Sequence, residues 1–190
     1  MPGIAKMLSE KYKVSLSTGS VEKINSALFR REYQKDEIIL NLDKTSKDVY
    51  IIEKGMVRQF YYKEGRDISE HFSCETDVVF CIESLFLEEP TLLLMEAIEY
   101  SVVYHLNYDK LKQLCDQYTD INRLYRRIME LDLVVSQRKA DSWRFESSRE
   151  RYERFCREYP EAAKRASVAH IATYLLMTPE TLSRVRAGVL

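Results

Sequence analysis

The stretch Ser167-Val-Ala-His-Ile-Ala-Thr-Tyr-Leu-Leu-Met-Thr-Pro-Glu-Thr-Leu-Ser-Arg-Val-Arg186 decides the fold of the C-terminal part of the chain. Its second half contains the start of a helix. The Thr178 hydroxyl can cap backbone N–H groups that lack a helical partner, and Pro179 follows at the first helical position, where a missing N–H costs nothing. Leu182 and Val185 lie three residues apart and can face inward. The stretch therefore predicts two short helices joined by a tight turn.

The preceding helix offers a matching apolar face, and the second helix keeps polar side chains on its outer faces. Arginine can bond bidentately to guanine, glutamate can accept from the cytosine amino group, and hydroxyls can serve bases or phosphates. The pattern predicts a helix-turn-helix that binds DNA, whereas the alternative is a well-capped surface helix with one Glu180–Arg184 ion pair. The inward residues are Ile171, Ala172 and Leu175, the expected base-reading residues are Glu180, Thr181 and Arg184, and the expected phosphate-binding residues are Thr178, Ser183 and Arg186.

The segment from Ile171 to Arg186 resembles the C-terminal helix-turn-helix of the Crp/Fnr family of bacterial transcription regulators. The resemblance is greatest to the branch common in Bacteroidetes, in which a Thr-Pro-Glu-Thr-Leu-Ser-Arg core recurs. One position departs from the family pattern, because Leu176 occupies the turn position that is usually glycine. A branched residue is strained where a turn needs positive φ, so the resemblance implies a strained turn at Leu176.

The charge of the chain is divided unevenly, although its net charge is only −1. Residues 123–190 hold fourteen Lys and Arg against nine Asp and Glu, whereas residues 1–122 hold fifteen against twenty-one. Phosphate binding requires excess positive charge near the DNA-contacting helix, so this division supports a DNA-binding C-terminal part. A solvated helix face rich in both arginine and glutamate would give the same count.

Short β-branched and aromatic runs separated by turn signals occupy residues 33–106, after a helical segment over residues 1–30. The run Asp48-Val-Tyr-Ile-Ile-Glu-Lys-Gly-Met-Val-Arg-Gln-Phe-Tyr61 resembles the hallmark hairpin of the Crp/Fnr sensor domain, with Gly55 at its turn. The resemblance implies an α+β fold with a cyclic-nucleotide-binding-like β-roll, a cupin-like double-stranded β-helix of jelly-roll type. The expected domains are the β-roll over 1–118, a dimerisation helix and hinge over 119–146, and a winged-helix-type helix-turn-helix domain over 147–190.

A long amphipathic helix is predicted from about Thr119 to Phe145. Its apolar residues step by four, three and four, which is the spacing of a coiled-coil seam. In the family the equivalent helix pairs with its twin, so the resemblance implies a homodimer that reads a palindromic DNA site with half-sites one helical turn apart. The alternative is that the same stripe packs on the β-roll of its own chain. The expected dimer-helix residues are Leu124, Ile128, Leu131 and Val135.

The segment Phe80-Cys-Ile-Glu-Ser-Leu-Phe-Leu-Glu-Glu-Pro-Thr-Leu-Leu-Leu-Met-Glu-Ala97 lies where cyclic-nucleotide-binding relatives hold the cyclic phosphate. These relatives bind the cyclic nucleotide through a Gly-Glu pair and through an Arg followed by Ser or Thr. Here Glu83 matches the ribose-binding glutamate, but Ile82 replaces its glycine, and Leu93 and Leu94 replace the Arg and the hydroxyl residue. The segment contains no cation, so we expect neither cyclic AMP nor cyclic GMP to bind in the usual mode.

Two interpretations of this pocket stay open. Its candidate residues are Glu83, Ser84, Leu93 and Leu94. It binds another effector of unknown identity, or it is a structural platform for the dimer. The resemblance also names RNA polymerase as a candidate partner. A second class of function is a β-roll sensor that acts through protein contacts rather than DNA, and salt-dependent DNA binding would separate the two.

Other features exclude several classes of protein. No apolar stretch is long enough to span a membrane and the N-terminus carries no signal peptide, so a cytoplasmic protein without a membrane partner is expected. Cys74, Cys81, Cys115 and Cys156 form no paired metal-ligand motif, and the three histidines are scattered, so no metal and no cofactor are expected. No nucleophile–base pair stands out, and an enzyme is not expected.

Overall fold

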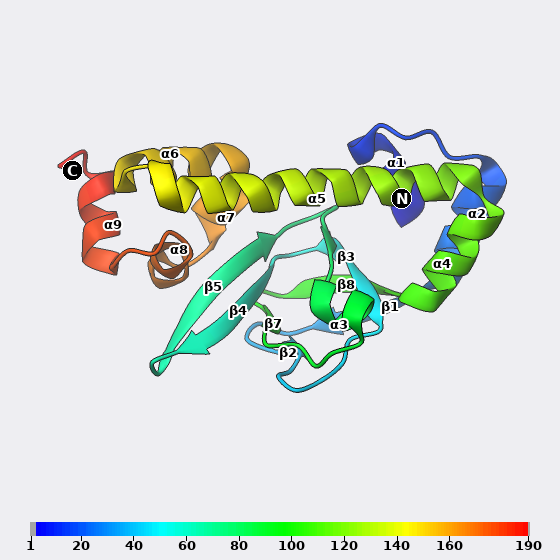
Figure 1. Ribbon diagram of the computed structural model, residues 1–190, viewed down its shortest axis with the longest axis horizontal. Coiled ribbons are helices and arrows are strands. Elements are labelled where there is room, and N and C mark those ends of the chain that lie inside the picture. The colour runs from blue at the N-terminus through cyan, green and yellow to red at the C-terminus, as the bar shows by residue number, and fades with distance from the viewer. Residues whose placement is uncertain (1–2, 190) are drawn as a thin grey trace.

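The computed structural model describes residues 3–189. Two short helices lead into a β-roll, a long helix leaves it, and a group of short helices ends the described chain (Figure 1). The strands are β1 (Leu28–Tyr33), β2 (Ile38–Leu40), β3 (Asp48–Lys54), β4 (Val57–Lys63), β5 (Arg66–Ser73), β6 (Val78–Val79), β7 (Leu94–Ala97) and β8 (Ser101–Asn107). The helices are α1 (Ile4–Tyr12), α2 (Thr18–Ala27), α3 (Ile82–Leu87), α4 (Tyr108–Gln117), α5 (Thr119–Phe145), α6 (Ser148–Glu158), α7 (Pro160–Arg165), α8 (Val168–Tyr174) and α9 (Pro179–Arg186).

The β-roll consists of two four-stranded antiparallel sheets, ordered β1-β8-β3-β6 and β2-β7-β4-β5. The expected hairpin over residues 48–61 does not form, because β3 and β4 lie in different sheets and do not pair with each other. Gly55, at φ +89°, instead turns the chain from one sheet into the other. A Cβ at this position would collide with the Tyr100 carbonyl and the Ser101 hydroxyl, so only glycine fits. The Gly55 N–H donates to Glu75 Oε1 at 2.9 Å, which ties this turn to the loop after β5.

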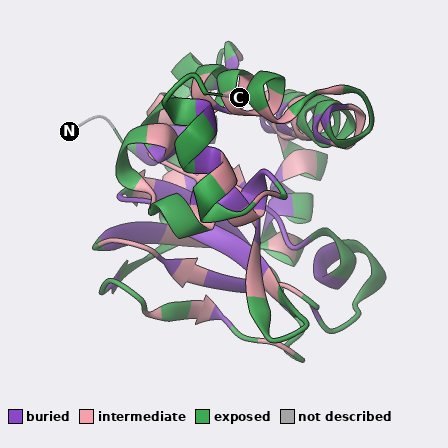
Figure 2. Ribbon diagram, turned by 90° about the vertical axis from the view of Figure 1, so that its left-hand side faces the viewer, coloured by how far each residue is buried: buried purple, intermediate pink, exposed green. Residues whose placement is uncertain are grey.

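Three apolar cores hold the molecule together, and Figure 2 shows their buried residues in purple along the strands and the inward faces of the helices. The first packs α1, α2, α4 and the first half of α5 against one sheet. The second fills the roll between the sheets, around Tyr33, Ile52 and Met95. The third joins Met56 and Phe72 of the β-roll to helices α6 to α9. The third core therefore fixes the C-terminal helical domain, defined as α6–α9, on the β-roll.

Helix α5 runs along the molecule from the α1, α2 and α4 end to the C-terminal helical domain (Figure 1). Its first half is anchored in the first core by Ile121, Leu124 and Ile128. Its last turns are anchored by the buried residues Lys139 and Ser142. Between these two anchors, residues 133–138 are all exposed, so the helix bridges the middle of the molecule.

The structure differs from the sequence-based expectations near the start of the chain. Of the helical segment expected over residues 1–30, residues 1 and 2 lie outside the described residues. The rest forms two helices, and residues 28–30 begin strand β1 instead. The C-terminal domain expected over residues 147–190 consists, in its described part, of the helices α6–α9, which include the expected helix-turn-helix. Leu190 lies outside the described residues.

Candidate nucleic-acid interface

Helices α8 and α9 form the predicted helix-turn-helix. Ser167 caps α8 by accepting from the His170 N–H at 3.1 Å, and Thr178 caps α9 by accepting from the Thr181 N–H at 3.2 Å. Pro179 occupies the first turn of α9, as the sequence predicts. The turn residue Leu176 adopts φ +53°, the left-handed conformation that disfavours a branched side chain. The expected strain at this turn is therefore present.

The inward faces of the two helices pack as their spacing predicts. Leu182 is fully buried in the third core together with the residues of the first helix of the motif, and Val185 is nearly buried. The buried residues of α8 and the turn are Ile171, Ala172, Tyr174 and Leu175. This packing fixes the angle between the helices and leaves the opposite face of α9 in solvent.

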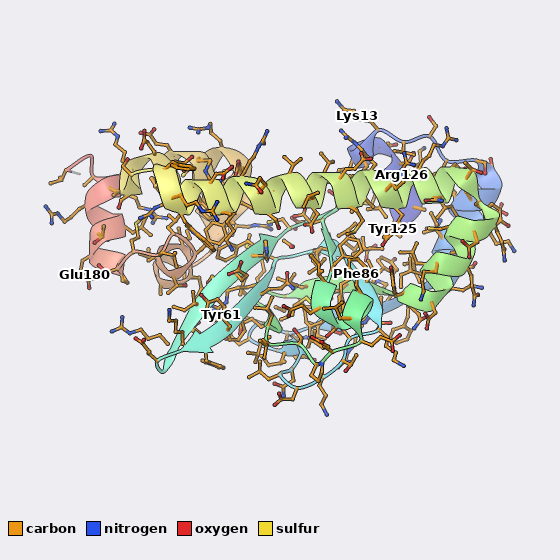
Figure 3. All side chains as sticks on the ribbon, in the orientation of Figure 1. Lys13, Tyr61, Phe86, Tyr125, Arg126 and Glu180 are labelled. Carbon is orange, nitrogen blue, oxygen red and sulfur yellow. The ribbon has the colours of Figure 1, made fainter. Side chains whose placement is uncertain are left out.

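The exposed face of α9 carries the predicted DNA-binding side chains at one end of the molecule, where Figure 3 labels Glu180. Thr178, Glu180, Ser183, Arg184 and Arg186 are exposed, and Thr181 is half-buried. The Glu180 backbone N–H, and then the Thr178 hydroxyl, lower the pKa of the Glu180 carboxyl, so it stays ionised and can accept hydrogen bonds. Throughout residues 3–189 no ion pair joins Glu180 to Arg184, contrary to the surface-helix alternative.

Arg186 differs from the other exposed residues of α9 because it has an aromatic neighbour. Its guanidinium carbon lies 5.5 Å from the centre of the Tyr152 ring on α6, within the range of a cation–π contact. This contact holds the stem of Arg186 at the C-terminal end of α9. The guanidinium donors remain exposed for an anion.

Strand β5 and helix α8 form the main polar contact between the β-roll and the C-terminal helical domain. The Thr173 hydroxyl accepts from the Ser69 N–H at 3.2 Å and donates to the Ser69 hydroxyl at 3.1 Å. Next to them, the buried guanidinium of Arg58 contacts Glu96 at 2.6 Å and Asp67 at 2.6 Å and donates to the Ser69 hydroxyl at 3.1 Å. Arg58 thereby holds Ser69 in position for Thr173.

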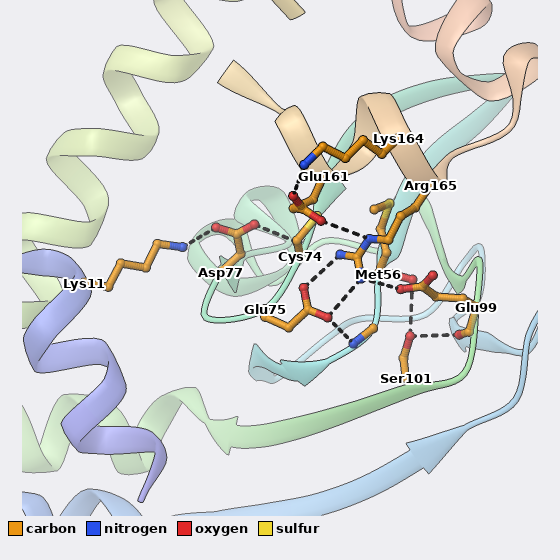
Figure 4. A network of polar contacts seen from close by, with 11 residues as sticks. Lys11, Met56, Cys74, Glu75, Asp77, Glu99, Ser101, Glu161, Lys164 and Arg165 are labelled. Atoms are coloured by element: carbon orange, nitrogen blue, oxygen red, sulfur yellow. Dashed lines mark hydrogen bonds and ion pairs between the residues drawn. The ribbon is translucent and has the colours of Figure 1, made fainter. Parts of the chain in front are cut away.

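A second set of ion pairs fixes α7 on the β-roll (Figure 4). Arg165 binds Glu75 through two parallel contacts of 3.1 and 2.8 Å and reaches Glu99 at 2.9 Å. Such bidentate pairs constrain both distance and orientation. Since Glu75 also accepts from the Gly55 N–H, the turn between β3 and β4, the loop after β5 and α7 are joined through one carboxylate.

A third link joins β5 to the end of α5 through Lys139, which is only 4% exposed. Glu70 is the unpaired residue of a β-bulge, because Gln59 pairs with His71 while Phe60 pairs with Ser69. Lys139 Nζ donates to the Glu70 backbone carbonyl and to its Oε1, the latter at 2.6 Å. The same ammonium lies 4.9 Å from the rings of Trp143 and Tyr174. Lys139 therefore contacts the β-roll, α5 and α8 together.

A cleft of about 1050 Å³ lies between α5 and the β-roll. Of the predicted pocket residues, Glu83 and Leu93 line it. Ser84 is buried and donates to the Glu89 carbonyl at 2.8 Å, which closes the turn after α3. Leu94 is buried in strand β7 and is not among the residues that line the cleft. The structure thus brings two of the four residues to one cleft.

The predicted dimer-helix residues separate into two environments. Leu124 and Ile128 are buried in the first core of their own chain, and Leu131 packs against that core. Val135 is exposed at the edge of the cleft. The apolar stripe with this spacing therefore faces its own β-roll at its start, which is the alternative that the sequence left open.

Two buried charges, Arg58 and Lys139, were not predicted as site residues. Lys139 continues the inward spacing of Ile128, Leu131 and Val135 by another four residues, so its inward position could have been inferred. Arg58 lies within an apolar strand, and a cation there indicates a buried partner. In both cases the partner lies far away in the sequence.

Comparison with known proteins shows which domain and which fold this structure matches. Residues 30–118 match the cyclic nucleotide-binding domain family. FixK2 of Bradyrhizobium japonicum has a similar structure, with a TM-score of 0.72 and 24% identity over 85% of this chain and 84% of that chain. The c-di-GMP responsive global regulator CLP of Xanthomonas campestris has a TM-score of 0.70 and 16% identity over 91% of each chain. The catabolite activator protein of Thermus thermophilus has a TM-score of 0.58 and 18% identity over 92% of this chain and 84% of that chain.

Residues 30–118 thus match a cyclic nucleotide-binding domain, and the chain as a whole shares its fold with these regulators. The resemblance inferred from sequence is confirmed at this level. The assignment to a Bacteroidetes branch stays a prediction. A comparison with curated protein sequences finds no significant match.

Two further properties concern residues 3–189. No group of three or more histidine, cysteine, aspartate or glutamate side chains there is arranged to hold a metal ion. None of the described helices combines the length and the apolar character that crossing a membrane requires.

Proposed function

We propose that this protein is a sequence-specific DNA-binding transcription regulator of the Crp/Fnr type. The observation that carries the proposal is helix α9, which is capped by Thr178, packed through Leu182, and exposes Glu180, Ser183 and Arg184 without an ion pair among them in the described chain. These side chains offer acceptors and donors that match base edges in a major groove. The excess of basic residues after residue 122 supports attraction of the phosphate backbone.

We propose further that the protein acts as a homodimer through an exposed face of α5. Residues 133, 136, 140 and 143 are spaced by three, four and three residues, as in a coiled-coil seam. Leu133 is 72% exposed and Trp143 is 38% exposed, which is unusual for apolar residues on a central helix. Ser136 and Ala140 are small and permit close approach of a second helix. This seam replaces the one expected from Leu124 and Ile128, which the chain's own core occupies.

A parallel pair of α5 helices would carry two α9 helices on one side of the dimer, which suits a palindromic site. The test is light scattering on purified protein. Leu133→Glu places a charge in the seam and is expected to give a monomer, whereas Arg123→Glu, on an exposed position outside the seam, is expected to leave the dimer intact. A dimeric Leu133→Glu variant would refute the seam.

DNA binding is tested by selection from a randomised duplex pool with purified protein at two salt concentrations. Recovery of a palindrome, with affinity that falls steeply as salt rises, is the expected result. Recovery of no sequence preference, with the protein folded, would contradict the proposal and favour action through protein contacts.

We propose also that the β-roll does not bind cyclic nucleotides in the usual mode. Leu93 lies at the cleft where a phosphate-binding arginine is needed, and Arg58, the buried cation of β4, is already paired with Glu96 and Asp67. A cyclic phosphate at Leu93 would lose its water without gaining a cation. Titration with cyclic AMP should therefore release or absorb no saturable heat.

A further inference from the structure

The cleft between α5 and the β-roll has a lining that is largely apolar and also contains charged side chains. The α5 wall contributes Ile128, Leu131 and Val135, and the β-roll wall contributes Val79, Phe80 and Leu93. Its volume of about 1050 Å³ is at the upper end of the range for small-molecule sites. An occupant of this cleft therefore needs a sizeable apolar body.

The charges that line the cleft are mainly negative. Its acidic residues are Glu70, Asp77, Glu83 and Asp132, and its basic residues are Lys11 and Arg138. Lys11 is paired with Asp77, and Glu70 is paired with Lys139. The carboxylates of Asp132 and Glu83 have no ion-pair partner in the described part of the chain. Arg138 also has no ion-pair partner there, so the unpaired charges of the lining are two carboxylates and one guanidinium. The balance of these unpaired charges favours a cation over an anion.

The lining of the cleft combines a carboxylate with aromatic rings. Asp132 projects from α5 as a lining residue, together with Tyr12 at the end of α1 and Tyr159 after α6. Burial raises the pKa of Tyr12, and the charges of Asp77 and Asp132 raise it further. Burial also raises the pKa of Tyr159 to about 12, again with contributions from Asp77 and Asp132. Both rings therefore lie within the electrostatic reach of the same carboxylate.

Asp132 itself lacks a compensating group. No hydrogen bond from a donor to its carboxylate is present within residues 3–189, and burial raises the pKa of this carboxyl. A carboxylate in such surroundings is stabilised by a hydrogen-bonded cation. Tyrosine faces attract the same kind of group through their ring quadrupoles.

We propose that the cleft binds an organic amine with an apolar, aromatic or aliphatic body, and that the Asp132 carboxylate accepts hydrogen bonds from its ammonium group beside Tyr12 and Tyr159. The apolar body lies along Ile128, Leu131 and Phe80. The role of the amine as an effector rests on the proposed function, because only a transcription regulator would use its binding to control DNA binding. The binding itself does not require DNA.

The cleft is placed to affect the DNA-binding helices through β5. His71 and Gln59 line the cleft, whereas Ser69, two residues from His71, bonds to Thr173 of α8. Glu70, between them, binds Lys139. An occupant that moves this strand therefore moves the contacts of the C-terminal helical domain.

The experiment uses calorimetric titration of the full chain with three probes: tryptamine, indole-3-acetate and cyclic AMP. Tryptamine and indole-3-acetate share the indole body and differ in the sign of their charge. Tryptamine is expected to bind saturably and about tenfold or more tightly than indole-3-acetate, consistent with one charge-assisted hydrogen bond. Equal or tighter binding of indole-3-acetate, or no binding of tryptamine, would overturn the proposal.

Asp132→Asn removes the charge and keeps the shape, and is expected to weaken tryptamine binding about tenfold. The control is Asp116→Asn on the exposed surface of α4, which should bind tryptamine like the parent protein. An unchanged tryptamine affinity in a folded Asp132→Asn variant would overturn the assignment of Asp132. The DNA selection is measured separately, so loss of amine binding with DNA binding intact rejects this inference alone, and the reverse result rejects the proposed function alone.

Discussion

The Thr173 hydroxyl lies 3.1 Å from the Ser69 hydroxyl, although 104 residues separate them in the chain. It also accepts from the Ser69 backbone N–H, which lies in strand β5. One threonine of the helix-turn-helix thereby completes the hydrogen bonding of a strand that also borders the cleft. The position of α8 is therefore coupled to the geometry of β5.

Thr173→Val is expected to lower the free energy of unfolding by about 1 kcal/mol, because it keeps the shape of the side chain and leaves the Ser69 N–H without its acceptor. Urea denaturation measures the loss, and hydrogen exchange of the Ser69 amide should become faster. Thr119→Val at the exposed start of α5 is the control and should change neither quantity. Unaltered exchange at Ser69 would mean that this hydrogen bond does not hold α8.

Lys139→Met should destabilise the protein by about 2 kcal/mol, less than for a fully buried pair because the Glu70 side chain is 24% exposed. The substitution leaves the Glu70 carboxylate partly buried without its cation. The double variant Lys139→Met with Glu70→Gln should recover most of the loss in urea denaturation. A double variant as unstable as the single one would show that Lys139 acts through its packing on Trp143 and Tyr174 instead.

Leu176→Gly is expected to stabilise the protein by about 1 kcal/mol, since the turn holds a positive φ that glycine adopts freely. Little apolar burial is lost, because Leu176 is 48% exposed. Leu176→Ala keeps a Cβ and should give no comparable gain. If alanine stabilised the protein as much as glycine, strain at this turn would not be the cause.

His71 makes the stability depend on pH. Burial, and then the Lys139 charge, lower the pKa of His71 from 6.5 to about 4, against the opposing effect of Glu70. The unfolded chain binds the proton more tightly, so the stabilisation is present above pH 6.5 and is lost as the pH falls toward 4. Between pH 7 and pH 5 the free energy of unfolding should fall by about 1 to 2 kcal/mol from this group, after a discount for its partial exposure. In His71→Gln, the difference in the free energy of unfolding between pH 7 and pH 5 should be smaller by that amount. An equal pH dependence in both proteins would contradict the assignment to His71.

Arg184→Ala should weaken binding to the selected DNA by about 1–3 kcal/mol and relax the preference at one base pair of each half-site. Competition with duplexes altered at single positions measures both effects. Arg149→Ala, on the exposed face of α6, is the control and should preserve base discrimination. Unchanged discrimination in Arg184→Ala would exclude Arg184 from base reading.

Features determined by local chemistry could be predicted from the sequence. The Thr178 cap, Pro179 and the burial of Leu182 each depend on residues within one or two turns of helix, and all three are observed. Ser147 likewise caps α6 in a capping box with Glu150. The left-handed turn at Leu176 followed from its place in the motif.

Features determined by distant partners could not be predicted in the same way. Strand β1 exposes most of its side chains at the edge of a sheet, so it lacks the alternation that marks a strand, and β6 is only two residues long. Helix α5 carries apolar residues on more than one face, and spacing alone does not say which face meets its own β-roll. The lining of the cleft combines residues from α1, α5 and the segment after α6, which only the folded chain brings together.

Strand β5 contacts the C-terminal helical domain and also borders the cleft. These two contacts limit which helical domains can be combined with this β-roll. Ser69 and Asp67 meet α8, and Glu75 meets Arg165 of α7. The surface of the β-roll is therefore matched to its own helical domain side chain by side chain. A chimera that grafts another regulator's C-terminal domain onto this β-roll would leave those charges unmatched. Under the proposed function, DNA specificity would be changed at the outer residues of α9, whereas transfer of the whole helical domain would require β5 to be transferred with it.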